Sequence, residues 1–210
     1  GEEVLLVAVT KLHSADEINE AIDCGITDIG ENKVQEIMDK YEKVKPVRWH
    51  LIGHLQTNKV KYIIDKVAMI HSVDSLHLAK EIDKRARQHG LVMDILIQVN
   101  SAMEESKFGI TTEETGKMID DILRECPNIR IRGLMCIAPF EDNPDDARVY
   151  FAEVKKLYDE YAKVHHPNLD FKYLSMGMSN DFEVAVEEGS NLIRVGTSIF
   201  GARDYSKKMG

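Results

Sequence analysis

Short apolar runs alternate with helical patterns along the whole chain. The first run covers 4–9 (Val-Leu-Leu-Val-Ala-Val), and a nearly continuous run of this length is typical of a strand covered on both faces of a parallel sheet. Ser14 then offers an N-cap, and apolar residues recur at helical spacing until Gly25, a common residue just after a helix. One strand–helix unit is therefore predicted by Gly25.

The same alternation continues to the end of the chain. It predicts strands over 27–30, 48–53, 67–73, 93–100, 129–137, 171–177 and 191–196, and helices over 32–43, 57–65, 75–89, 112–126, 145–164 and 181–188. Strict alternation favours parallel strands joined by right-handed crossovers. Eight such units in 210 residues favour a (β/α)₈ TIM barrel over an open doubly wound sheet. With no Pro/Gly/Ser-rich linker in between, one domain over 1–210 is expected.

Composition narrows the class of partner. The chain has 27 Lys and Arg against 36 Asp and Glu, a net charge of −9, which disfavours nucleic acid. No apolar run reaches the ~20 residues of a membrane span, and the acidic start is unlike a secretion signal, so a cytoplasmic protein is expected.

The three cysteines form no CxxC pair, and we expect them reduced in small core sites. The acidic surface without an obvious apolar stripe favours a monomer.

Lys11 stands at the end of the first strand, after Val9 and Thr10. In barrels of this kind the reactive groups lie at the C-terminal ends of the strands. A partly desolvated lysine at that position can form a Schiff base with an aldehyde. The alternative is a lysine that simply extends into solvent.

Two loops at the ends of the last two strands have the composition of a phosphate site. In 175–181 (Ser-Met-Gly-Met-Ser-Asn-Asp), Gly177 allows close approach of the backbone, Ser175 and Ser179 supply hydroxyls, and a helix is expected to begin near Asn180. The segment 196–198 (Gly-Thr-Ser) repeats this chemistry. Loops at these positions commonly hold phosphate in TIM barrels, which suggests a phosphorylated small molecule.

Other polar residues leave alternatives open. Arg194 lies inside a buried strand, so either an acidic side chain or a ligand must meet its guanidinium. Glu31 and Asn32 end the second strand, where they could orient a ligand, although Asn32 could equally cap the next helix. His50 and His54 have no carboxylate at metal-ligand spacing, so no metal site is predicted.

Five segments of the chain resemble the motifs of the pyridoxal 5′-phosphate (PLP) homeostasis proteins. The resemblance runs in order from 4 to 205 and is carried by 7–11, 30–36, 49–59, 175–181 and 194–205. It implies a PLP-binding barrel similar to the N-terminal domain of alanine racemase. Family members usually carry a helix before the first strand, so we expect either a removed upstream segment or a short variant here.

The resemblance also implies roles for individual residues. By that likeness Lys11 forms a Schiff base with the cofactor aldehyde, Arg194 faces the pyridine nitrogen, and Asn32 lies near the ring. The phosphate would be held by Ser179, Gly196, Thr197 and the backbone near Met178.

An arginine beside the pyridine nitrogen makes the cofactor a weak electron sink. The chain ends nine residues after Gly201, so no further domain is expected to supply a second base for racemisation. We therefore expect a carrier that stores, buffers or delivers PLP to apo-enzymes that require it, without robust turnover. The alternatives are an amino-acid racemase that uses His54 or Lys107 as its second base, and a phosphometabolite enzyme with a different Schiff base on Lys11.

Overall fold

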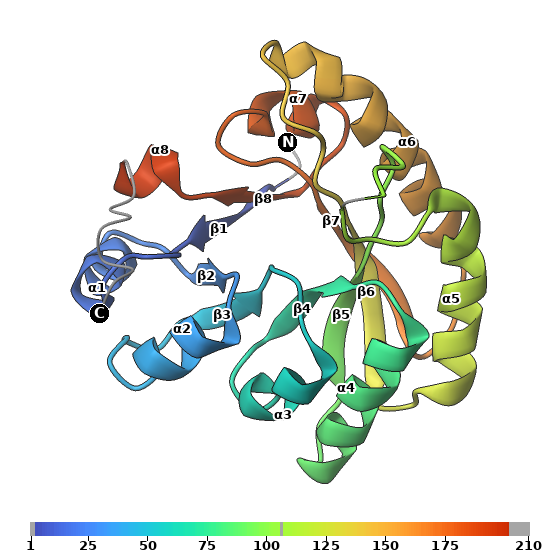
Figure 1. Ribbon diagram of the computed structural model, residues 1–210, viewed down its shortest axis with the longest axis horizontal. Helices are drawn as coiled ribbons and strands as arrows, with labels where there is room; N and C mark the ends of the chain where they lie inside the picture. The colour runs from blue at the N-terminus through green and yellow to red at the C-terminus, as the bar shows by residue number, and fades with distance from the viewer. Residues whose placement is uncertain (1–2, 106, 202–210) are drawn as a thin grey trace.

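Eight parallel strands close into a barrel in the computed structural model, which describes residues 3–105 and 107–201 (Figure 1). The strands lie in chain order, and β1 pairs with both β2 and β8. The strands are β1 (Leu5–Val9), β2 (Asp28–Glu31), β3 (Arg48–Leu51), β4 (Met69–Val73), β5 (Met93–Gln98), β6 (Ile129–Met135), β7 (Leu169–Ser175) and β8 (Leu192–Val195). The predicted (β/α)₈ TIM barrel is confirmed, and the open sheet is excluded.

Helices follow the strands and surround the barrel (Figure 1). They are α1 (Ala15–Asp23), α2 (Val34–Lys40), α3 (Val60–Ile63), α4 (Leu76–Gln88), α5 (Thr112–Glu125), α6 (Arg148–Tyr161), α7 (Phe182–Glu187) and α8 (Thr197–Phe200). Short 3₁₀ turns, η1 (Thr57–Lys59) and η2 (Pro144–Ala147), precede α3 and α6. The predicted helix over 57–65 is thus divided in two, and α8 was not predicted because a single turn has no periodic pattern.

Local sequence explains where the first helix begins. The Ser14 hydroxyl accepts the N–H of Glu17 at 3.2 Å, and the Glu17 carboxylate accepts the N–H of Ser14 at 3.3 Å. This reciprocal capping box satisfies two N–H groups that would otherwise lack partners at the helix start. The N-cap predicted at Ser14 is therefore confirmed, and it ends the loop that carries Lys11.

The barrel has two cores, one on each side of the sheet. The larger one lies between strands and helices, and Ile29, Ile70 and Phe151 are among its fully buried members. The smaller one fills the barrel interior with side chains from five strands: Val7, Met69, Leu96, Met135 and Leu192. Buried polar side chains share that interior, so it is not the purely aliphatic packing common in such barrels.

The cysteines only partly match expectation. Cys126 and Cys136 are buried, whereas Cys24 is exposed at the C-cap of α1, so the core placement expected for Cys24 is wrong. Within the described ranges, no helix has the length and apolar character needed to span a bilayer.

Candidate functional site

Four of the predicted site residues follow four adjacent strands. Ser179 follows β7, Gly196 follows β8, Lys11 follows β1 and Asn32 follows β2, and these strands are neighbours around the barrel in that order. Because the strands are parallel, all four residues lie at the C-terminal end of the barrel. The fold therefore brings them onto one arc of the mouth.

Lys11 lies in a tight turn just beyond β1. The Thr10 N–H donates to the carbonyl of Gly30 at 3.0 Å, and the Leu12 N–H donates to the Glu36 carboxylate at 2.8 Å. Leu12 has φ of +65°, an uncommon conformation for a bulky residue. The Lys11 side chain is half-buried and has no hydrogen bond or ion pair with the described residues. Its backbone is thus fixed while its amine is available.

The buried side chain of Glu31 stabilises this turn through hydrogen bonds. The fully buried Glu31 carboxylate accepts from the Thr10 hydroxyl at 2.6 Å and from Lys40 Nζ at 2.8 Å. Lys40 also donates to the Thr10 carbonyl at 3.0 Å. Burial, reinforced by Glu36 and opposed by Lys40, raises the pKa of Glu31 to about 7. The expectation that Glu31 orients a ligand is wrong, because its bonds are to the chain itself.

The two predicted phosphate loops contact one another. The Gly196 N–H donates to the Ser179 hydroxyl at 3.3 Å. The Met178 N–H donates to the Asp181 carboxylate at 2.8 Å, so this backbone group is already engaged. In the described part of the chain, the N–H groups of Ser179 and Asn180 donate to no acceptor. Two backbone donors next to the Ser179 hydroxyl thus remain for an anion.

Gly177 gives this loop its shape. It has φ of +104°, and a Cβ there would lie 2.9 Å from the Cα of Phe182, so a larger residue would be strained and crowded. Helix α7 begins at Phe182 with Asp181 as its N-cap, slightly later than expected. The Thr197 side chain, predicted to bind phosphate, lies outside the described residues.

No acidic side chain meets the Arg194 guanidinium among the described residues. Its buried guanidinium donates to the Ser175 hydroxyl and, at 3.0 Å, to the Cys136 carbonyl. Burial lowers the pKa of Arg194 to about 10, which leaves it a cation at neutral pH. The Ser175 hydroxyl, expected in the phosphate loop, is fully buried and occupied by this contact. The remaining N–H groups of the guanidinium have no partner among the described residues.

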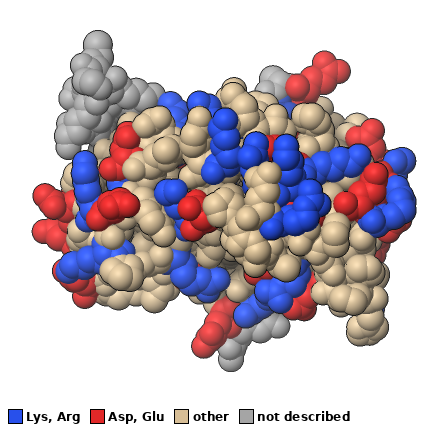
Figure 2. Space-filling model, turned by 90° about the horizontal axis from the view of Figure 1, so that it is seen from below, with Lys and Arg blue, Asp and Glu red and all other residues tan. Residues whose placement is uncertain are grey.

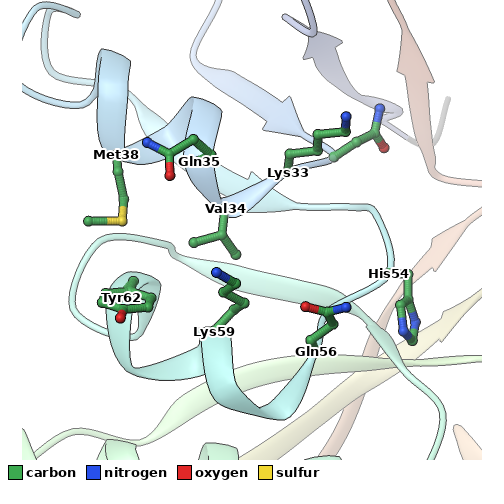
Figure 3. Close-up of a pocket in the computed structure, with 9 residues that line it drawn as sticks. Lys33, Val34, Gln35, Met38, His54, Gln56, Lys59 and Tyr62 are labelled. Carbon is green, nitrogen blue, oxygen red and sulfur yellow. The ribbon is translucent and has the colours of Figure 1, made fainter.

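Asn32 does not cap the following helix, because Lys33 is the N-cap of α2 and makes no side-chain cap. Gly53 lies so close to the Asn32 backbone that a Cβ on residue 53 would overlap its carbonyl. Asn32 lines an open hollow of about 580 Å³ beside the mouth, between α2 and η1–α3. In Figure 3, Lys59 extends toward Val34 inside this hollow.

The two residues considered as a second base lie on the loops after β3 and β5, and His54 lines the same hollow as Asn32. His50 is buried, whereas His54 is exposed and stacks on Phe108 with ring centroids 3.7 Å apart. Lys107 pairs with Glu104 at 3.3 Å. Across 3–105 and 107–201, no three His, Cys, Asp or Glu side chains are grouped to hold a metal.

Comparison with known proteins identifies close relatives. The sequence matches the family described as the alanine racemase N-terminal domain over residues 2–204. It is 46% identical to the pyridoxal phosphate homeostasis protein of Aquifex aeolicus over 95% of this chain and 87% of that protein. It is 39% identical to the protein of the same name from Escherichia coli over 99% of this chain and 89% of the other.

A solved structure agrees with these sequence matches. PipY of Synechococcus elongatus, determined with PLP bound, superimposes with a TM-score of 0.85 at 35% identity. The superposition covers 94% of this chain and 92% of that structure.

Proposed function

The chain belongs to the family of pyridoxal phosphate homeostasis proteins, and from that membership we propose that it binds pyridoxal 5′-phosphate and acts in intracellular PLP homeostasis. The observation that carries the proposal is the arc of Lys11, Asn32, Ser179 and Gly196 at the mouth of the barrel, with Arg194 behind it. PipY, with PLP bound, has the same fold at 35% identity.

The chemistry of these residues fits the cofactor group by group. Lys11 has an amine without a partner in the described chain, as a Schiff base with an aldehyde requires. Ser179, Gly196 and Thr197, with the backbone near Met178, would hold the phosphate. Arg194 has N–H groups left over after its two hydrogen bonds, and these suit an acceptor such as a pyridine nitrogen.

Bound PLP supplies a reactive aldehyde and an electron-withdrawing ring. Lys11 would supply the amine for a Schiff base with that aldehyde. Arg194 would donate to the ring nitrogen and, as a cation, would not protonate it, and Asn32 would lie near the ring. This set of residues would hold the cofactor without promoting carbanion chemistry, so we propose a carrier rather than an enzyme.

Exposed apolar side chains on the loops after β5, β6 and β7 suggest how delivery occurs. Met103 and Phe108 follow β5, Ile137 and Phe140 follow β6, and Met178 follows β7; between 39% and 75% of each side chain's surface is exposed. We call these five residues the apolar rim. Exposed apolar patches commonly mark protein interaction sites. We propose that this monomer docks transiently on PLP-dependent apo-enzymes through the rim.

We further propose the cytoplasm as its location, because its three cysteines are free and Cys24 is exposed, as is usual for reduced compartments.

The first experiment is a visible absorption spectrum with added PLP, before and after borohydride reduction. The wild-type protein should show a Schiff-base band, and reduction should attach PLP covalently to the peptide that contains Lys11. Lys11→Ala should lose both signals. Lys33→Ala, a substitution of an exposed lysine near the neighbouring strand, serves as the control and should retain them. A band that persists without Lys11 would refute the Schiff base.

A second experiment separates a carrier from a racemase. The loaded protein is incubated with alanine in deuterated water, and deuterium at the α-carbon is measured by mass spectrometry. A carrier should exchange the α-hydrogen far more slowly than the ordinary enzyme rates of about 1 s⁻¹ or more. Rapid exchange would instead support the racemase.

A further inference from the structure

A continuous chain of hydrogen-bonded side chains crosses the barrel interior and ends on Arg194. His50 lies 2.7 Å from Asp28 (Nε2 to Oδ1) and 2.9 Å from His71 (Nδ1 to Nε2). The other ring nitrogen of His71 lies 3.2 Å from the Ser175 hydroxyl, which also contacts the Arg194 guanidinium. These five residues, one each from β2, β3, β4, β7 and β8, are at most 3% exposed. We call them the polar relay.

The chemistry of its two ends gives the relay a direction. Arg194 can only donate, so the Ser175 oxygen accepts from it and the Ser175 hydrogen points to His71. With that nitrogen accepting, neutral His71 carries its proton on the side of His50. His50 in turn donates its Nε2 proton to Asp28, which as a carboxylate only accepts. Each of the other four members therefore donates once toward Asp28.

Burial and neighbouring charges favour this arrangement. Burial, together with the positive charge of Arg194, holds the pKa of His71 well below its usual value, so His71 is neutral. Burial opposes ionisation of Asp28, but hydrogen bonds from His50 and from Thr27 lower its pKa overall. A relay in the opposite direction would require His50 to carry two protons. When each imidazole carries a single proton, only one direction satisfies all five groups.

The relay links two opposite charges that do not touch. A buried guanidinium without a carboxylate partner is costly, and the two groups that meet Arg194 directly are both neutral. Aligned hydrogen bonds in a low-dielectric interior polarise one another, so the negative charge of Asp28 is felt at Arg194. Asp28 lies at the start of β2, away from the mouth, and the half-exposed Arg48 approaches it to 3.7 Å.

We propose that Asp28, His50 and His71 are positioning residues for the cofactor, which act through Ser175 to fix the orientation of Arg194 toward the pyridine nitrogen of PLP. None of the three lies among the residues that hold PLP in the proposed function, on which this inference rests. The relay determines which guanidinium N–H groups are occupied and leaves the others directed at the ring. A guanidinium held in this orientation would donate to the ring nitrogen and would leave it unprotonated.

The test uses PLP labelled with ¹⁵N in the ring, bound to the whole protein at neutral pH. Nitrogen NMR distinguishes a ring nitrogen that accepts a hydrogen bond from a protonated one. His71→Leu should weaken PLP binding by about three- to tenfold, the effect of losing one ordinary hydrogen bond in the relay. It should also move the ¹⁵N signal toward that of free PLP. Asp28→Asn keeps the shape and removes the charge, and should shift the signal in the same direction by a smaller amount.

Ile70→Ala controls for loss of stability, because Ile70 precedes His71 on β4 and packs in the outer core instead. It should lower the thermal unfolding temperature and leave the ¹⁵N signal unchanged. The positioning role is overturned if folded His71→Leu and Asp28→Asn proteins bind PLP with the wild-type affinity and signal. If wild type itself forms no adduct on Lys11, the proposed function fails instead, so the two failures are distinguishable.

Discussion

At the scale of single residues, Glu31 determines how firmly the Lys11 turn is held. Its carboxylate joins the Thr10 hydroxyl and the Lys40 amine, while its second oxygen is buried without a hydrogen-bond partner. Burial of a carboxylate with one unpartnered oxygen disfavours its charged form, and the pKa of Glu31 therefore rises to about 7. The turn that presents Lys11 therefore depends on an acid that titrates near neutrality.

This makes stability depend on pH in a defined direction. The carboxyl ionises near 4.5 in the unfolded chain and near 7 in the folded one. The contribution of Glu31 is thus fully present below pH 4.5 and is lost as pH rises through 7, by up to about 3 kcal/mol. Glu31→Gln should flatten this part of the profile, measured by urea unfolding from pH 5 to 8. An unchanged slope in the variant would show that Glu31 does not titrate in this range.

At the scale of elements, the position of Lys11 depends on the start of α1 as well as on β1. Only a short turn separates Lys11 from Ser14, where the capping box begins the helix. Fraying of that helix start would therefore loosen the turn from its other side. Helix α4 has an equivalent serine cap, Ser75, whose hydroxyl accepts from Leu78 N at 3.1 Å. That cap follows β4, which carries no proposed ligand-binding residue.

These two caps give a matched pair of variants. Ser14→Ala and Ser75→Ala should each lower the free energy of unfolding by about 1 kcal/mol, the usual effect of losing a helix cap. Ser14→Ala should also weaken PLP binding, measured by fluorescence titration, whereas Ser75→Ala should leave it unchanged. Equal PLP affinity in both variants would show that the helix start does not influence the Lys11 turn.

At the scale of the whole molecule, charge and apolar surface are unevenly distributed. Although the net charge is −9, many Lys and Arg side chains crowd the face seen in Figure 2. The segment from η1 to α4 is rich in such residues: Lys59, Lys61, Lys66, Lys80, Lys84, Arg85 and Arg87. The apolar rim lies on the loops at the C-terminal ends of the strands, where the cofactor is proposed to enter and leave.

Delivery through the rim has a direct test. Phe140→Ser, at a side chain 75% exposed, should slow transfer of PLP to an apo-enzyme at least several-fold and leave the PLP affinity unchanged. Val92→Ser is the control, because Val92 is 56% exposed on the loop before β5, at the opposite end of the barrel. Transfer would be followed by recovery of the recipient's activity. Equal rates for both variants would count against docking at the rim.

Most of the fold was predictable because alternating strands and helices leave a periodic pattern, and the strand ends then indicate Lys11, Asn32 and Gly196. The partners of Arg194 were not predictable. Ser175 and Cys136 lie 19 and 58 positions away from it, and His71 meets Ser175 across 104 positions. No local pattern encodes such contacts, because only barrel closure brings these strands together. Inward positions on strands occupied by His, Asp and Ser were the available signal.

Closure of the barrel also has a consequence for synthesis of the protein. Residues Leu5 to Ala8 of β1 pair with Leu192 to Val195 of β8. The first strand therefore cannot complete its pairing until the last strand has been made. At ribosomal rates of ~5–20 residues per second, Arg194 is added some ten to forty seconds after Lys11. The cofactor pocket thus cannot assemble before β8 has been made. Until then the β1 edge that faces β8 stays unpaired, and PLP would stabilise only the closed barrel.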